Sequence, residues 1–307
     1  MYGWLFYVVR VLYCWIARKD FPKAREFVRT YVRKIGSITF AVAVSMGAFA
    51  YYQNEIDPAK LPLITISNGD KTVRFQGMAH IASPSFYAGV KNDIAASRNE
   101  GYVLFYEGVK PGSAENSKKF DAIMGFKFDK NLYEAMSKLY GLVPQNQAEL
   151  AGHPDARDRN VDVSIDDIVK AYENRRGSVS GEPVPNFSEA EGAASDFSAE
   201  LVKEADSYNS RELAVVRYFL RAMMSLVIKN RDTGEAAFAG LGKVDLFASI
   251  LDDRNEVLAD AIATTEEKKV FVTYGMLHFD GVFYLLQEKD PRWKIVGTPK
   301  DGYPTLP

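Results

Sequence analysis

The sequence is poor in cysteine and histidine. Its 307 residues include one cysteine, Cys14, and three histidines. Because Cys14 lies in the first apolar stretch, the rest of the chain has no internal disulfide and no thiolate nucleophile. The Gly-x-Ser-x-Gly turn that presents a nucleophilic serine is absent as well. These absences argue against a cysteine- or serine-based hydrolase.

The chain also lacks a charge excess of either sign. It has 38 Lys and Arg against 40 Asp and Glu, a formal net charge of −2. Nucleic-acid-binding domains usually carry a clear basic excess, so we expect no nucleic-acid partner. The part that follows the first 52 residues is long enough for one large core or two smaller domains.

The longest run without a charged side chain lies near the N-terminus and includes Ile35–Tyr52. As a helix it would measure about 27 Å, enough to cross a hydrocarbon core. The preceding stretch is basic, which by the positive-inside rule keeps it cytoplasmic. We therefore interpret residues 1–52 as a membrane anchor or signal segment with a periplasmic or extracellular body. The basic residues are Arg10, Arg18, Lys19, Lys23, Arg25, Arg29, Arg33 and Lys34.

Three other interpretations of this segment stay open. Ala48-Phe49-Ala50 offers a small-x-small cleavage site, so the segment could be a signal peptide that is removed and leaves a secreted body. Met1–Ile16 is a second apolar stretch, which would make the segment a hairpin of two spans. The last alternative is a buried amphipathic helix.

The body shows the pattern of an α/β fold, with α+β as the alternative. Leu63–Ile66 and Lys71–Gln76 are predicted strands around an Asn-Gly-Asp turn, and Pro84–Arg98 is a helix capped by Ser83. Tyr102–Tyr106 has the apolar run of a buried parallel strand. We predict one domain over residues 60–300, with a mixed sheet, helices on its faces and a large helical insertion at about 115–265. Further helices are expected at 131–140, 165–174, 213–228, 243–264 and 281–288, a loop at 177–187, and strands at 269–274 and 293–296.

Two copies of one tetrapeptide are the most informative feature of the body: Gly77-Met78-Ala79-His80 and Gly275-Met276-Leu277-His278. Each follows a predicted strand and precedes a helix-start signal, Ser83-Pro84 or Asp280-Gly281. The glycines Gly77 and Gly275 would permit a tight turn where the strand ends. A histidine just past that turn points into the crevice where open α/β sheets bind ligands. The two histidines could therefore share one site.

Glu107, at the end of the third predicted strand, would complete the set. Two imidazoles, His80 and His278, and one carboxylate suffice to hold a catalytic divalent ion with positions left for water and substrate. Glu107 would be the third ligand or the general base, and the sequence does not separate these roles. The alternative is that each histidine is a structural strand-end residue and that Glu107 is a helix N-cap or a solvated loop residue.

Arg254 and Asn255 are further candidates. The guanidinium of Arg254 could hold a substrate carboxylate or a developing oxyanion, with Asn255 in support, or the pair could lie on a solvated helix face. We expect the third histidine, His153, to be an exposed loop residue. The apolar segment Leu213–Ile228 is interpreted as a buried amphipathic helix rather than a second membrane span, because Arg217 and Arg221 lie one turn apart on it.

In this order of motifs the chain resembles the TraB/GumN/Tiki superfamily of metallopeptidase-like proteins. The matching residues are Gly77–His80, Glu107, a middle segment at 139–145, Arg254-Asn255, and Gly275–His278 followed by Gly281-Val282. The resemblance covers nearly the whole body. It implies an α/β domain with both histidine motifs facing one site, a divalent ion (manganese or cobalt in the Tiki branch, with zinc as a further option) and peptide cleavage. Other branches inhibit peptide pheromones.

The sequence features are consistent with three functions. The first is a membrane-anchored, divalent-metal-dependent hydrolase that cleaves a peptide or protein substrate outside the cytoplasm, with the metal on His80, His278 and Glu107. The second is a non-catalytic protein of the same fold that sequesters a peptide or signal. The third is a structural membrane protein whose apolar N-terminus drives assembly.

Overall fold

The structure is a computed structural model that describes residues 22–127, 129–152, 155–179, 197, 199–230 and 244–306. The chain divides into two compact units, Met1–Tyr52 and Gln53–Pro307. The predictions for Met1–Ile16, Cys14 and His153 lie outside the described residues.

The described part of the first unit is one long helix, α2 (Pro22–Tyr51), which continues into the π-helical turn η1 (Tyr52–Ile56). Thr30–Ile56 is long and apolar enough to cross a membrane. The predicted N-terminal apolar helix is thus present, and its length and composition suit a signal sequence or an anchor.

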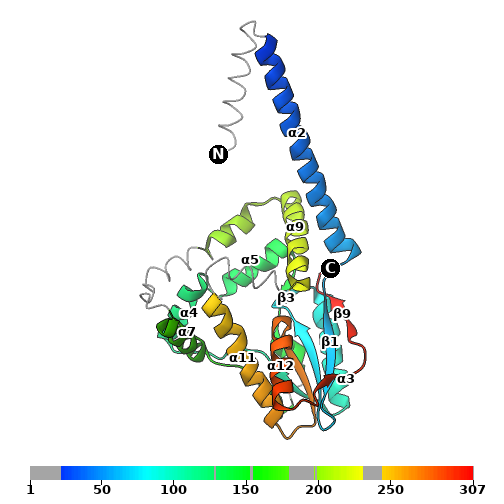
Figure 1. The fold of residues 1–307 in the computed structure, drawn as a ribbon, viewed down its shortest axis with the longest axis vertical. Helices are drawn as coiled ribbons and strands as arrows, with labels where there is room; N and C mark the ends of the chain where they lie inside the picture. Colours follow the sequence, from blue (N-terminus) through cyan, green and yellow to red (C-terminus); the bar gives the residue numbers. More distant parts are fainter. Residues whose placement is uncertain are drawn as a thin grey trace. The chain divides into compact units, whose positions relative to one another are not determined.

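The second unit is built on a mixed sheet, as predicted. Within the described residues it has seven strands in the order β6-β4-β7-β2-β1-β8, with β9 also paired to β1. Figure 1 shows β1 and β9 side by side. The strands β2, β7, β4 and β6 run parallel to one another, whereas β1 is antiparallel to its neighbours. The strands are β1 (Lys60–Ser67), β2 (Thr72–Met78), β4 (Val103–Tyr106), β6 (Arg159–Asn160), β7 (Lys269–Gly275), β8 (Lys294–Ile295) and β9 (Lys300–Pro304).

The hairpin between β1 and β2 forms for the reason the sequence suggests. The Asn68 side chain accepts hydrogen bonds from the backbone N–H groups of Asp70 and Lys71, and Gly69 has a φ of +92°. Such side-chain turns with a glycine in the left-handed region are typical connections between antiparallel strands.

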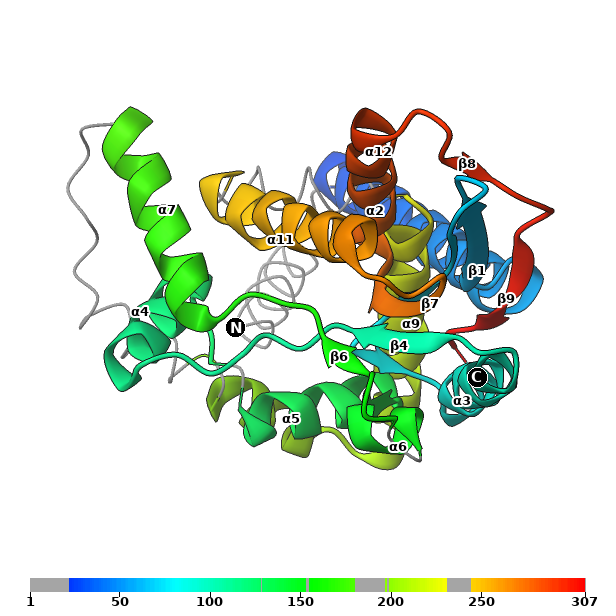
Figure 2. The same cartoon turned by 90° about the horizontal axis from the view of Figure 1, so that it is seen from below.

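Helices cover both faces of the sheet (Figure 2). On one face, residues such as Phe75 and Val272 pack against Leu258 and Ile262 of α11 (Val244–Thr264) and against α12 (Phe279–Lys289). The opposite face, including Leu104 and Phe271, packs against α3 (Pro84–Asn99). The chain is therefore a three-layer α/β structure, which accounts for the continuous apolar runs of its parallel strands.

The other predicted helices are also present, and several have the expected caps. Ser83 Oγ accepts from Phe86 N at the start of α3, and Gly141, with φ +62°, ends α5. Ser164 and Asp167 exchange hydrogen bonds at the start of α7. The insertion between β4 and β7 contains α11 and, before it, the helices α4 (Ala114–Met124), α5 (Lys130–Tyr140), α6 (Gln147–Ala151), α7 (Ile165–Val179) and α9 (Ser210–Lys229).

Three local predictions need correction, and one strand was not predicted. The loop predicted at 177–187 begins later, because α7 continues to Val179; the rest of that loop lies outside the described residues. The strand predicted at 293–296 is β8, but β9 follows it. Gly302 in β9 comes so close to β1 that an added Cβ would lie 1.9 Å from Leu61 O. Helix α12 starts at Phe279, so Gly281 lies inside it rather than before it. Helix α9 buries only part of its surface, with Leu213, Ala222 and Ser225 inside.

The turn before β2 also supports α11. Lys71 Nζ donates to the carbonyl oxygens of Ile262, Ala263 and Thr265 at 3.1, 2.6 and 2.5 Å. These carbonyls end α11, where helices leave acceptors without intrahelical partners and favour a cation. Burial, followed by the nearby charge of Lys268, lowers the pKa of Lys71.

We expect Lys71→Met to lower the free energy of unfolding by about 1–3 kcal/mol, because three carbonyls lose their donor. Urea denaturation of the full chain measures this loss. Lys268→Met is the matched control at an exposed neighbouring lysine, and we expect it to leave the stability nearly unchanged. Equal effects of the two substitutions would show that Lys71 does not cap α11.

Candidate functional site

The candidate residues follow the carboxyl ends of adjacent parallel strands. Strand β7 lies between β2 and β4 and is parallel to both. His80 follows β2, Glu107 follows β4, and His278 follows β7. The strand order therefore explains why these three chain segments meet at the carboxyl end of the sheet, as predicted.

The two Gly-Met-x-His motifs pack against each other. Their strands are in register, with Gly77 opposite Tyr274 and Met78 opposite Gly275. A Cβ on Gly77 would lie 2.6 Å from Met276 Sδ. Gly77 and Gly275 are not among the described glycines with positive φ. A left-handed backbone therefore does not account for either glycine, and close approach explains Gly77.

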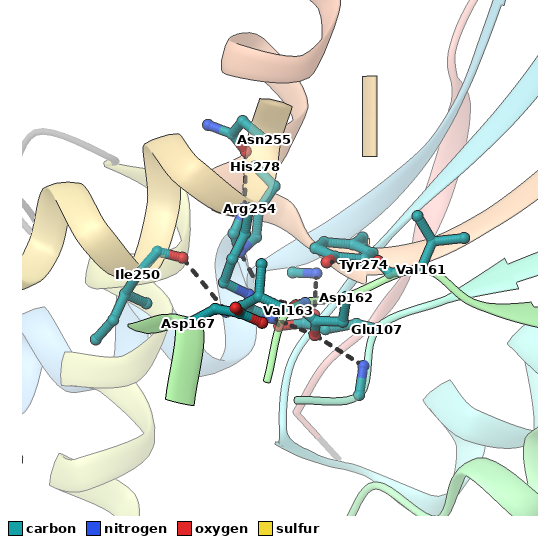
Figure 3. Close-up of polar contacts among 12 residues, drawn as sticks. Glu107, Val161, Asp162, Val163, Asp167, Ile250, Arg254, Asn255, Tyr274 and His278 are labelled. Atoms are coloured by element: carbon teal, nitrogen blue, oxygen red, sulfur yellow. Dashed lines mark hydrogen bonds and ion pairs between the residues drawn. The ribbon is translucent and has the colours of Figure 1, made fainter. Parts of the chain in front are cut away.

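His278 is buried and fixed in one orientation. It ends the 3-10 turn η2 (Met276–His278) and is 3% exposed. Its Nδ1 lies 2.7 Å from Asn255 Oδ1, and its ring packs edge-on against Tyr274 at 4.9 Å between centroids (Figure 3). With Nδ1 engaged by an amide oxygen, Nε2 carries the free lone pair. Burial lowers the pKa of His278 to about 4, against the opposing effect of Glu107, so the ring is neutral at pH 7.

Gly281 leaves space for the Asn255 side chain that orients His278. A Cβ at Gly281 would lie 2.3 Å from Asn255 Nδ2. Helix α12 can therefore approach α11 closely only with glycine at this position. The glycine that the sequence suggests as a helix-start signal instead makes room for the residue that holds His278.

Glu107 faces His278 and is held by two donors. Its Oε1 accepts from Arg254 Nη2 at 2.5 Å, and its Oε2 accepts from Gly275 N at 2.7 Å. The distance from Oε1 to His278 Nε2 is 4.0 Å. Burial on its own would raise the pKa of Glu107. The charge of Arg254 and the nearby His80 and His278 outweigh this and lower it to about 2.

Arg254 is shared between two buried carboxylates. Besides Glu107, it donates from Nε and Nη2 to Asp162 Oδ1 and Oδ2 at 2.8 and 2.9 Å (Figure 3). Asp162 also accepts from the backbone N–H of Gly108 and Val163, and its side chain is fully buried. Asp162 is not among the candidate residues predicted from the sequence. A lone carboxylate between Val161 and Val163 is the signal that could have identified it, because an acidic residue in an apolar run needs a partner.

These contacts change the expected roles of Arg254 and Asn255. The Arg254 side chain is 5% exposed and bonded to protein carboxylates. It is therefore not available to bind a substrate carboxylate, as the sequence had suggested. Asn255 orients His278 instead of supporting Arg254. Both residues hold the buried part of the site in place.

His80 differs from the other two candidates because its side chain is exposed. Its charge contributes to the pKa values of both Glu107 and His278, so it lies within electrostatic reach of both. Among the residues that the structure describes, no three His, Cys, Asp or Glu side chains lie close enough to hold a metal ion. The structure therefore brings two of the three predicted donors together and leaves His80 outside that pair.

The chemistry of the donors is nevertheless suited to a divalent ion. His278 is neutral with its Nδ1 anchored, which is the usual state of a metal-ligating histidine. Glu107 is ionised, and Nε2 and Oε1 face each other. At 4.0 Å they are close to the separation of two atoms that bind one ion at about 2.1 Å each.

Two tyrosines border this region and were not foreseen. Burial and then the charge of Glu107 raise the pKa of Tyr133, in the first turn of α5. Tyr133 packs against the small cluster that contains Ile81, next to His80. Burial followed by the nearby Tyr133 raises the pKa of Tyr87, whose hydroxyl donates to Ala79 O at 2.8 Å. Both phenols therefore stay protonated beside the His80 segment.

Fold and site together define an α/β protein with a buried His–Glu–Arg–Asp cluster at the carboxyl ends of its parallel strands. Comparisons of the chain with protein-family models, with curated proteins and with solved structures find no match. The arrangement of the site is therefore the basis for any functional assignment.

We expect Asp162→Asn to destabilise the protein by about 3 kcal/mol, because it removes one of the two charges that balance buried Arg254. Chemical denaturation of the full chain measures this change. Asp260→Asn is the control. Asp260 lies on α11 and forms an exposed ion pair with Lys289 of α12, so its loss should have no measurable effect. A stable Asp162→Asn protein would mean that Glu107 alone holds Arg254.

The buried state of His278 predicts a pH dependence of stability. Its pKa is about 4 in the folded protein and 6.5 in the reference state. Between these values the unfolded chain binds more protons, so stability is complete above pH 6.5 and falls as the pH drops towards 4. The loss from this group is on the order of 2–3 kcal/mol.

Urea denaturation in the presence of a chelator, across this pH window, measures the effect. His278→Gln removes the titrating ring, and the difference between the two proteins isolates it from the carboxylates that also titrate. Identical pH dependence in both proteins would contradict a neutral, buried His278.

Proposed function

We propose that the protein is a membrane-anchored, divalent-metal-dependent hydrolase of the TraB/GumN/Tiki type that cleaves peptides outside the cytoplasm. The observation that carries this proposal is the pair formed by His278 Nε2 and Glu107 Oε1, 4.0 Å apart at the end of adjacent parallel strands. His80, at the end of the next strand, supplies the third donor from the exposed side.

The charge of the buried cluster supports a cation. Glu107 and Asp162 contribute two negative charges and Arg254 one positive charge, and His278 is neutral, which leaves a formal charge of −1. Backbone N–H donors from Gly108, Val163 and Gly275 offset part of it. An uncompensated buried charge is unfavourable, so the cluster favours a positive ion next to Glu107 and His278.

The protein groups have distinct roles in this proposal. A bound divalent ion would polarise the scissile carbonyl and lower the pKa of a water molecule. Glu107 suits the part of ligand better than that of general base, because a carboxylate with a pKa of about 2 is a weak proton acceptor at pH 7. Asn255 fixes the His278 ring so that Nε2 faces the site, and Arg254 keeps the Glu107 carboxylate ionised and in place.

One observation favours a second candidate, a non-catalytic protein that binds a peptide. Both oxygens of Glu107 already accept hydrogen bonds from Arg254 and Gly275. Such a carboxylate is satisfied without a metal, and the same fold could then hold a peptide in the region bordered by His80 and Tyr133. This candidate requires binding that is independent of divalent ions.

Metal binding by the purified full chain tests the first proposal. We expect manganese to bind at a ratio of about one ion per chain and to be lost in the His80→Ala/His278→Ala double variant. Asn255→Ala should weaken the affinity by about 10–100-fold, because the orienting partner of a ligand histidine is removed. Isothermal titration calorimetry measures both effects.

His153→Ala is the matched control, since it removes a histidine that has no part in the proposed site. Cleavage of a quenched-fluorescence peptide library by the wild type, with loss in His278→Ala, would support the hydrolase. If the double variant binds manganese as the wild type does, the metal site is wrong. Peptide binding without cleavage that survives the double substitution supports the second candidate.

A further inference from the structure

Helix α9 is bonded to Gln53 and Asn54 of the turn η1, the first residues of the second unit. Asn54 Nδ2 donates to Tyr218 O at 2.8 Å, and Ser225 Oγ donates to Gln53 O at 3.2 Å. Both Gln53 and Asn54 fall within Thr30–Ile56, the stretch long and apolar enough to cross a membrane. Helix α9 therefore lies directly beside the carboxyl end of that stretch.

The attachment continues into the first residues after it. Lys229 Nζ forms an ion pair with Asp57 at 2.7 Å and donates to Gln53 Oε1 at 2.9 Å. Ala59 N donates to Ser225 Oγ at 3.0 Å, in a buried contact just before β1. These bonds fix the helix over more than two turns, from Tyr218 to Lys229.

The side of α9 away from the body is apolar. Val215, Met223 and Val227 are 58%, 50% and 38% exposed, and half-buried Phe219 lies between them. These residues recur every four positions, so they form a single stripe along one face of the helix. From Val215 to Val227 the stripe measures about 18 Å.

The opposite side of α9 packs against α5 and forms hydrogen bonds with its last residues. Leu213 packs in a cluster with Leu139 of α5. Arg217 Nε donates to Lys138 O, and Arg221 donates to the carbonyls of Tyr140 and Gly141. The two arginines thus cap the end of α5. With this face engaged, the helix cannot rotate to bury its apolar stripe.

We propose that the stripe Val215–Phe219–Met223–Val227 contacts the lipid bilayer in which the N-terminal apolar helix is anchored. The proposal rests on the membrane anchoring that forms part of the proposed function. It does not depend on the metal site.

The contacts of α9 favour a lipid surface as the partner of the apolar stripe. An anchored helix places its carboxyl end at the membrane interface, and the bonds of Gln53 and Asn54 hold α9 at that same level. An exposed apolar stripe at this level gains free energy by entering the boundary between headgroups and acyl chains. The tether keeps the local concentration of lipid high, so even a short stripe suffices.

The test uses the full chain reconstituted in phosphatidylcholine vesicles that contain brominated acyl chains. In a Cys14→Ser background, which removes the only native cysteine, an environment-sensitive fluorophore is attached at Met223→Cys. A second variant, Val215→Cys, guards against local effects of one label. We expect bromolipid to reduce the fluorescence at both positions roughly twofold, as for an apolar face in the acyl boundary.

Ile295→Cys is the matched control. Ile295 is also an exposed apolar residue, at 45%, but it pairs with Ile66 at the far end of β1 from Ala59 and α9. We expect no quenching there. Co-flotation of the protein with vesicles is recorded in parallel and reports on anchoring.

The outcomes distinguish membrane anchoring by the N-terminal helix from lipid contact by the stripe on α9. Flotation with quenching at 215 and 223 but not at 295 supports the lipid contact. Flotation without quenching at 215 and 223 overturns it and leaves the anchor intact. Failure to float overturns the anchor and the lipid contact together, and the metal titration remains an independent test of the site. Quenching that requires high protein density, with dimers on cross-linking, assigns the stripe to a second copy of the chain and also overturns the proposal.

Discussion

The buried guanidinium of Arg254, shared by Glu107 and Asp162, is the interaction on which the candidate site depends. It connects α11 with the residue that follows β4 and with the segment that follows β6. Each carboxylate satisfies part of the arginine, and neither is exposed to water that could replace the other. A network of this kind is favourable only when every member is present, since a missing partner leaves a buried charge uncompensated. The position of Glu107 is therefore determined by residues from three separate parts of the chain.

This network also fixes the protonation states around it. Arg254 holds Glu107 as a carboxylate, whereas burial keeps His278 as a neutral imidazole. The two shifts are opposite in origin: in one the charged form is stabilised by a partner, and in the other the charged form is penalised by the loss of water. The result is an anionic oxygen and a neutral nitrogen facing each other near pH 7. Such a pair has little tendency to exchange a proton.

The sequence was informative where local rules decide the structure. Apolar runs bounded by glycine located β2, β4 and β7, and the capping residues Ser83 and Gly141 located helix ends. It was uninformative where a residue acts through distant partners. Asp162 and Arg254 are 92 positions apart, and their pairing follows from the packing of α11 on the sheet. The reason for Gly281 is likewise a contact with another helix. Strand β9 depends on pairing with β1 at the other end of the domain, which no local pattern indicates.

Different parts of the structure position His80 and the buried pair of Glu107 and His278. Ile81, the next residue, belongs to a small cluster in which Tyr133 of α5 and Met224 of α9 also pack. Helix α9 caps α5 and is bonded to the end of the apolar N-terminal stretch. His278 and Glu107, in contrast, are held by the sheet, α11 and α12. The site therefore combines two donors fixed in the core with one donor next to the part of the body that continues from the N-terminal helix. The buried pair is thus positioned by the sheet and two helices, whereas the exposed His80 is positioned by the packing around Ile81.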